Sequence, residues 1–374
     1  MRDVTRVFTS LISVALGLDN KVDGECDNKR LLDLANLHDL AHLISFGARK
    51  AGYNLGEYTD EFSARETRAI FRHVKIHKEL TDMTSAFERI GVDFIFLKGS
   101  TLRYLYPAPW MRTSSDIDVL IRPDHIEKAK DTLIKLGYNY LGEWRYEQRF
   151  DSPTNVHIEM QTTLVDDEDA TSEYLSNIWD NAMLVDGFSH KYDMCDEQFL
   201  FYHIAHMAKH MSSGGCGVRP FVDLVIINSK GENKAFHDTI KSAKLHTFYD
   251  AVKALIAKWF KGENRVVTAG LEEYVLRGGL FGTYENTVSV RGGKGKIAYV
   301  FGRIFPRYRD MSDMYPVLKK CKILLPIFYI VRWFSLVIKF IKGKGRDELK
   351  AVKNMDKSDA TAVAKLFEEL GLGE

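Results

Sequence analysis

Two aspartates separated by a single residue are the clearest candidates for chemistry in this chain. Asp116 and Asp118 stand within residues 115–121, where aliphatic residues occupy the alternate positions. Because successive side chains of a strand point to opposite faces, the two carboxylates share one face and Ile117 points into a core. Neighbouring carboxylates repel each other unless a cation lies between them, and Mg²⁺ prefers such oxygen ligands. The spacing therefore predicts half of a metal site.

A small turn precedes the aspartates along the chain. The apolar residues 94–97 predict a strand that ends at Lys98, Gly99 and Ser100. Glycine lets the backbone approach a ligand closely, and the amides of such a turn, with a serine hydroxyl, can surround a phosphate. We therefore expect a phosphate cradle beside the two aspartates.

A third carboxylate follows on a later alternating stretch. Residues 155–163 place Ile158 on one face of a predicted strand, and His157 and Glu159 on the other. Glu159 is then expected to complete the metal site from a strand beside the aspartates. A surface glutamate on an edge strand is the alternative interpretation.

In this order the three elements resemble the nucleotidyltransferase superfamily of the DNA polymerase β type, which has a Gly-Ser turn, an Asp-x-Asp strand and a later acid. The chain is more closely similar to the bacterial family of uncharacterised nucleotidyltransferases. The motifs that carry this resemblance are Leu-Lys-Gly at 97–99, Arg112, Asp-Ile-Asp at 116–118 and the acidic strand 156–159. The likeness continues in residues 203–210, 214–220 and 305–326. The connection 101–115 is longer than the polymerase-like spacing and predicts an enlarged loop.

The resemblance implies transfer of a nucleoside monophosphate from an NTP to an acceptor hydroxyl or phosphate, with release of pyrophosphate. Two Mg²⁺ or Mn²⁺ ions would be held by the catalytic residues Asp116, Asp118 and Glu159. The nucleotide-binding residues that it implies are Lys98, Gly99, Ser100 and Arg112. The acceptor, a small molecule or a protein, stays open, as do the base of the NTP and the oligomeric state.

Two other functions remain open at this point. The first is a catalytically weak nucleotide sensor or assembly module; for this module, as for an active enzyme, a place at the membrane surface of a cell-envelope pathway stays open. The second is a kinase-type phosphotransferase, which also uses carboxylates and Mg²⁺ but releases ADP.

Composition limits the classes of partner. The 374 residues suggest two or three modules, and the formal net charge of +1 argues against a duplex nucleic-acid binder. The four cysteines form no Cys-x-x-Cys pair, which argues against a disulfide framework or a zinc ribbon. A reducing cytoplasm, including the inner face of a membrane, is the expected location.

The patterning predicts an α+β fold, with strands and helices between two helical modules, and the resemblance implies that this core is a small mixed sheet with helices of the polymerase β type. The expected domains are an N-terminal helical module at 1–90, the catalytic core at 91–170, a helical domain at 171–345 and a polar tail with a short helix at 346–374. Apolar residues recur at helical intervals in 31–44 and 59–90. Further helices are expected at 235–243, 246–260 and 271–276.

Several histidines and one arginine are further candidates. His203, His206 and His210 fall on one face of a predicted helix and either line the cleft, pack, or bind a metal. Arg219 either reaches the site or pairs with Asp223 on a surface. His38 and His42 stand one helical turn apart, but no third ligand is spaced to complete a metal site.

The most apolar segment of the chain is 323–341. Its length approaches the roughly 20 residues of a membrane span, yet Pro326, Arg332 and Lys339 interrupt it. Three interpretations stay open: a core helix, a membrane span, or an interfacial helix that makes a peripheral membrane contact. In the last case the flanking Lys319, Lys320, Lys342 and Lys344 would meet lipid phosphates.

Overall fold

The computed structural model describes residues 2–144, 146–164, 171–263, 265–280, 282–283, 286–287, 290, 301–341 and 357–373, without the side chains of 337, 339–341 and 357. They form two compact units. The first combines Met1–Met207 with Val218–Val267, and the second combines Ala208–Gly217 with Thr268–Glu374. Of the expected polar tail, residues 346–356 lie outside the described residues, and the short helix is α19 (Lys357–Glu369).

The first unit begins with four α-helices: α1 (Arg2–Leu16), α2 (Asn28–Leu37), α3 (Ala41–Ala51) and α4 (Thr59–Ile90), with a 3₁₀ turn η1 (Gly56–Tyr58) before α4. A Cβ at Gly47 would lie 2.1 Å from the carbonyl oxygen of Leu11, so only glycine lets α1 and α3 pack this closely. The single helical segment expected at 31–44 is wrong. Asp39, with a φ of 52°, separates α2 from α3.

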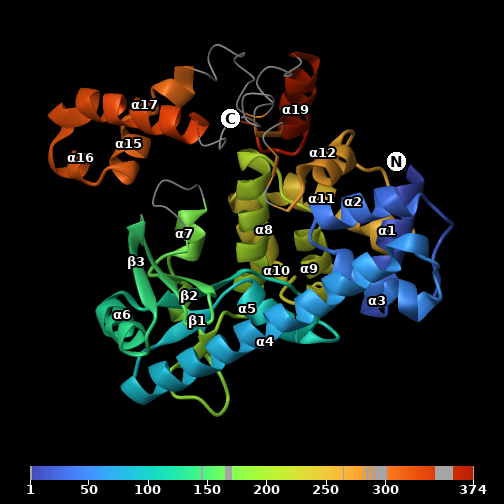
Figure 1. The fold of residues 1–374 in the computed structure, drawn as a ribbon, viewed down its shortest axis with the longest axis horizontal. Coiled ribbons are helices and arrows are strands. Elements are labelled where there is room, and N and C mark those ends of the chain that lie inside the picture. Colours follow the sequence, from blue (N-terminus) through green and yellow to red (C-terminus); the bar gives the residue numbers. More distant parts are fainter. Residues whose placement is uncertain are drawn as a thin grey trace. The chain divides into compact units, whose positions relative to one another are not determined.

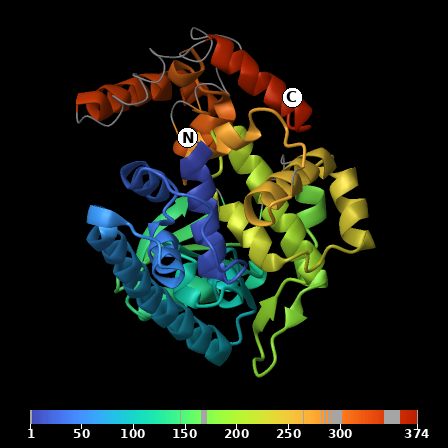
Figure 2. The same cartoon turned by 90° about the vertical axis from the view of Figure 1, so that its right-hand side faces the viewer.

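Within the described residues, seven strands form one mixed sheet in the order β3-β4-β5-β2-β1-β7-β6. The strands are β1 (Phe94–Phe96), β2 (Asp116–Ile121), β3 (Asn139–Trp144), β4 (Glu147–Asp151), β5 (His157–Gln161), β6 (Met183–Leu184) and β7 (Lys191–Asp193). Strand β2 runs antiparallel to β1 and parallel to β5. The hairpin of β6 and β7, lime green at the lower edge of Figure 2, joins β1 and was not predicted. The expected α+β class with a mixed sheet is confirmed.

The two faces of the sheet differ in chemistry. One face packs on α4 and α6 (Ile126–Lys135), and Figure 1 shows α4 running along the sheet. The buried side chains at this interface are Leu80, Met83, Phe87, Phe94, Phe96, Ile117, Val119, Leu133, Ile158 and Met160. Period-two alternation places Asp116, Asp118, His157 and Glu159 on the other face, as expected.

The remaining elements of the first unit connect and cover the sheet. The enlarged loop expected at 101–115 folds into the short helices η2 (Arg103–Leu105) and η3 (Pro109–Met111), after α5 (Gly99–Leu102). The other elements are η4 (Pro123–His125), α7 (Ser172–Leu175), η5 (Ile178–Asp180), α9 (Arg219–Ile227), α10 (Lys234–Ser242) and α11 (His246–Phe260). Helix α8 (Asp196–Ser213) contributes residues to both units.

The second unit contains α12 (Leu271–Gly278), α15 (Tyr308–Met314), α16 (Val317–Lys320), η7 (Lys322–Leu324), α17 (Leu325–Ile341) and α19. The helices expected at 235–243, 246–260 and 271–276 are confirmed as α10, α11 and α12. The core interpretation of 323–341 does not hold for one face of α17, where Phe334 is 66% exposed. Among the described residues, the helices are too short or too polar to cross a membrane.

A pH dependence of stability follows from His42. The side chain is buried, and its Nε2 lies 2.8 Å from the carbonyl oxygen of Met111. Burial lowers the pKa of His42 from 6.5 to about 4. Between these values the unfolded chain binds more protons than the folded chain, so the contribution of His42 is complete above pH 6.5 and is lost as the pH falls toward about 4.

We predict that the folded protein loses about 2 kcal/mol through His42 between about pH 7 and about pH 5. His42→Gln keeps a donor for Met111 but does not titrate, so this share of the pH dependence should disappear. Urea unfolding of both proteins at the two pH values measures it. Identical pH slopes would contradict the assignment.

Candidate active site

The three predicted carboxylates lie on adjacent strands. In the parallel pairing of β2 with β5, Asp118 is opposite Glu159 and Asp116 is opposite His157. Asp118 is buried, whereas the side chain of Glu159 is 26% exposed. His157 Nε2 lies 3.8 Å from a Glu159 oxygen. We call Asp116, Asp118 and Glu159 the acidic cluster.

Lys98 lies against the acidic cluster. Its Nζ donates to Asp118 Oδ1 at 2.7 Å. The backbone that follows β1 is unusual at this residue, with φ 47° and ψ −122°, a conformation that disfavours residues other than glycine. Burial alone would lower the pKa of Lys98, but the Tyr202 oxygen and the Asp118 carboxylate raise it above its ordinary value. Lys98 is therefore a charged ammonium held on Asp118.

One ammonium does not balance the acidic cluster. Burial, and then the charge of Asp118, raise the pKa of Asp116. Burial raises the pKa of Glu159 to about 7, with further contributions from Asp118 and Glu147. Shifts in this direction mean that the ionised carboxylates lack sufficient positive charge nearby.

The donor set fits a divalent cation, since carboxylate oxygens in excess of nearby positive charge are the ligands that Mg²⁺ prefers. Among the described residues, no three His, Cys, Asp or Glu side chains converge on one point as they stand. An oxygen of Asp118 is instead taken by Lys98. A cation bound through this Asp118 oxygen would compete with the Lys98 ammonium.

The Gly99–Ser100 turn lies directly beside these residues. The Leu97 amide donates to the carbonyl oxygen of Asp118 at 3.0 Å, which ties the turn to β2. A Cβ at Gly99 would stand 3.0 Å from the Cβ of Ser114, so the turn packs closely only with glycine. The Ser100 amide donates to the Leu97 carbonyl, whereas the Ser100 hydroxyl is buried without a hydrogen-bond partner among the described residues. This hydroxyl is the group of the turn that a bound ligand would satisfy.

Arg103 fixes the turn from within the protein, a role that sequence reasoning missed. The side chain is 1% exposed; Nε donates to the Gly99 carbonyl at 2.9 Å and Nη2 donates to Ser114 Oγ at 2.5 Å. Burial lowers the pKa of Arg103 to about 10. The spacing of four residues from Gly99 is the one local signal for this contact, because such residues are neighbours on a helix.

Arg112 forms a buried bidentate ion pair with Asp223. Its Nε and Nη2 donate to the two Asp223 oxygens at 2.6 and 2.9 Å, and its Nη1 donates to the Thr113 carbonyl. That Nη1 would lie 3.3 Å from a Cβ on Gly99. Arg112 thus supports the turn from the protein side, and its direct contact with a nucleotide stays a prediction.

Tyr202 and Glu147 are two further residues near the acidic cluster that the sequence did not reveal. Tyr202, on α8, is buried and lies close enough to Lys98 and Asp118 for their charges to act on it. Burial raises the pKa of Tyr202, so the phenol stays protonated at neutral pH. Glu147 opposes Gln161 across β4 and β5 and adds negative charge beside Glu159.

The helical histidines and Arg219 make packing contacts. His203 Nε2 lies 3.0 Å from the Pro220 carbonyl oxygen, and the His206 ring is 5.9 Å from the Tyr202 ring. Arg219 donates to Asp39 at 2.7 Å, so its expected surface pairing with Asp223 is wrong. His210 also lies on α8. Cleft lining by these four residues stays a prediction.

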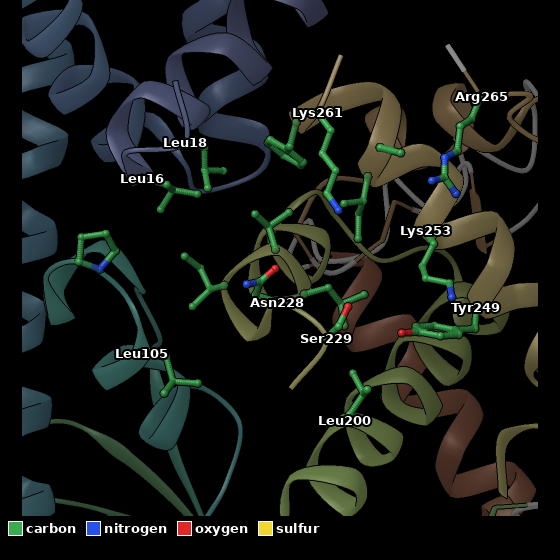
Figure 3. Close-up of a pocket in the computed structure, with 17 residues that line it drawn as sticks. Leu16, Leu18, Leu105, Leu200, Asn228, Ser229, Tyr249, Lys253, Lys261 and Arg265 are labelled. Carbon is green, nitrogen blue, oxygen red and sulfur yellow. The ribbon is translucent and has the colours of Figure 1, made fainter. Parts of the chain in front are cut away.

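A cavity of about 600 Å³ lies elsewhere in the first unit (Figure 3), and Leu16, Leu105, Leu200 and Tyr249 are among the residues that line it. The acidic cluster is not part of its lining. Lys253, at its edge, is paired with Glu232 at 2.9 Å. The residues that line the cavity include no aspartate or glutamate, so the sheet face with the acidic cluster is the candidate site.

The buried pair behind the turn gives a stability prediction. Asp223→Asn leaves the Arg112 charge buried and unbalanced, so we expect the free energy of unfolding to fall by about 3–5 kcal/mol. Asp82→Asn is the matched control, because Asp82 pairs with Lys78 on an exposed helix surface and should leave stability unchanged. Urea denaturation measures both. Equal losses would show that the buried pair is not the supporting interaction.

Comparison with known proteins agrees with this geometry. The family model described as an uncharacterised nucleotidyltransferase matches residues 24–261, which is more than half of the chain and includes the acidic cluster, the Gly99–Ser100 turn and Asp223. No curated protein matches the chain. From the extent of the family match, the chain belongs to the uncharacterised nucleotidyltransferase family.

Proposed function

We propose that the protein transfers a nucleoside monophosphate from an NTP to an acceptor hydroxyl or phosphate, in a reaction that requires Mg²⁺ or Mn²⁺ and releases pyrophosphate. The observation that carries the proposal is the acidic cluster. Its three carboxylates lie on one face of the adjacent strands β2 and β5, beside the Gly99–Ser100 turn, and the pKa of Glu159 is raised to about 7. Membership of a nucleotidyltransferase family supports the same reaction class.

In this reaction an acceptor oxygen attacks the α-phosphorus, the bond from that phosphorus to the oxygen bridging to the β-phosphate breaks, and pyrophosphate leaves. Asp116, Asp118 and Glu159 would hold the metal. When bound, the metal supplies charge neutralisation for the triphosphate and lowers the pKa of the attacking hydroxyl. Glu159, the more exposed of the two paired carboxylates, is the residue that we expect to receive the acceptor's proton.

The turn residues bind and orient the triphosphate. Glycine at position 99 lets the turn pack closely against Ser114 and Arg112, and the buried Ser100 hydroxyl would gain a hydrogen-bond partner from the triphosphate. Lys98 leaves Asp118 and places its ammonium against the charge that develops on pyrophosphate. Arg103 and Arg112 act through the turn, by holding its backbone in position.

The acidic cluster makes the first functional prediction. Asp116→Asn, Asp118→Asn and Glu159→Gln each remove a carboxylate without changing size, and each should lower the transfer rate by at least about a hundredfold. Purified protein is incubated with each α-³²P-labelled NTP, Mg²⁺ and a cell extract as the source of acceptors. Labelled product and pyrophosphate are both quantified.

Glu143→Gln is the matched control, because Glu143 is exposed on the same sheet at β3. It should transfer label like the unaltered protein. Release of ADP in place of pyrophosphate would show a kinase-type reaction instead. Nucleotide binding that requires Asp116 and Asp118, with no label transferred, would support the sensor function and contradict the enzyme.

Lys98 should affect metal binding and catalysis in opposite directions. In Lys98→Met no ammonium competes for Asp118, so the Kd for Mn²⁺ should fall. Transfer should slow, because the charge on pyrophosphate is less well neutralised. The slowing should be smaller than in the carboxylate variants. Electron paramagnetic resonance titration gives the Kd without turnover. Lys130→Met, at a partly exposed pair with Glu127 on α6, is the control and should change neither quantity. Weaker Mn²⁺ binding by Lys98→Met would rule out the exchange.

A further inference from the structure

Helix α17 uses one face to pack within a small helical assembly of the second unit. Figure 1 shows α15 and α16 on one side of α17. Trp333 and Tyr329 each pack on the ring of Phe305, at 5.4 and 5.5 Å between centroids, and Phe328 packs on Tyr315 at 4.8 Å. Trp333 Nε1 also donates to the Ile304 carbonyl. These contacts fix which face of α17 is turned inward.

The opposite face of α17 is apolar and exposed. Its side chains recur at intervals of three or four residues, as one face of a helix requires. We call them the apolar row: Ile327, Ile330, Phe334 and Ile338 of α17, together with Ile323 of the preceding turn η7, with exposures of 55%, 49%, 66%, 51% and 87%. Arg332, the charged residue whose side chain is described within α17, is buried and donates to the Arg303 carbonyl. The apolar row is therefore free of charge along its described length.

Positive charge is concentrated at both ends of this helix. Residues 314–345 contain seven lysines and arginines and no aspartate or glutamate, although the whole chain has a formal net charge of only +1. Lys319, Lys320 and Lys322 precede α17, where Lys319 lies 3.7 Å from an oxygen of Asp313, and Lys342 and Lys344 follow in the sequence, in residues outside the described part. An uncharged apolar face between two basic clusters is the composition that lies in the interface of an anionic bilayer.

We propose that α17 lies on an anionic lipid surface, with the apolar row among the acyl chains and the exposed Lys320 and Lys322 at the headgroup phosphates. The charge pattern favours an anionic lipid surface over a second copy of the chain as the partner of the apolar row, because two copies would bring like-charged lysines together. The proposal does not depend on nucleotidyl transfer. It would place the second unit at a membrane whatever reaction the first unit performs.

Co-sedimentation of the full-length protein with vesicles tests the proposal. Phosphatidylcholine vesicles are compared with the same vesicles carrying phosphatidylserine, at low and high salt. We expect binding to the anionic vesicles, weak binding to the neutral ones, and a loss of binding as salt rises. Equal binding to both kinds of vesicle, or none to either, would overturn the proposal.

Two variants separate the apolar and charged contributions. Ile330→Gln/Phe334→Gln removes part of the apolar row and should lower vesicle partitioning by at least about tenfold. Lys320→Gln/Lys342→Gln/Lys344→Gln should lower partitioning to the anionic vesicles alone. Both change exposed or flanking positions, and circular dichroism verifies that each protein is folded.

Phe71→Gln is the matched control, because Phe71 is equally exposed, at 67%, on α4 of the first unit. It should bind vesicles like the unaltered protein. Loss of binding in Phe71→Gln as large as in Ile330→Gln/Phe334→Gln would overturn the assignment to α17. A dimer that forms without lipid as the protein concentration rises would also overturn the proposal, if Ile330→Gln/Phe334→Gln abolishes it and Phe71→Gln does not. The apolar row would then be the contact surface between two copies of the chain.

Discussion

Repulsion among carboxylates that share one face of a sheet is the constraint on which the first unit depends. Asp116, Asp118 and Glu159 are brought together by the parallel pairing of β2 with β5, while the opposite face of the same strands packs in the core. Core packing therefore fixes the acids in place despite their repulsion. The Lys98 ammonium relieves part of this repulsion by pairing with Asp118. The Lys98 backbone adopts a conformation that is unfavourable for lysine.

The surroundings of the turn show how buried charge is kept in place. Arg103 and Arg112 are both buried behind Gly99, and each donates to several oxygens. A buried guanidinium without such partners would be strongly destabilising. Because the partner of Arg112 is Asp223, on α9, the support of the turn depends on a helix that follows the sheet in the sequence.

Prediction from sequence succeeded where the signal was local. Alternation at 116–118 and 157–159 was enough to place the acids on one face, because the period of a strand is fixed by its backbone. The two-residue strand β6 and the break at Asp39 were missed, since neither leaves a periodic pattern. Tyr202 reaches the site through a tertiary contact that spacing does not encode, and the contact of Arg103 with Ser114 likewise has no local signal. The apolar row of α17 has the same spacing whether it is buried or exposed, so only the structure distinguishes the two.

The most direct test of the account is to locate Mn²⁺ in crystals grown with α,β-methylene-ATP, which cannot transfer its nucleotide, using the anomalous signal of the metal. The account predicts Mn²⁺ bound by Asp116, Asp118 and Glu159, with Lys98 displaced from Asp118 toward the triphosphate. Nucleotide bound elsewhere, with Lys98 still 2.7 Å from Asp118, would contradict it.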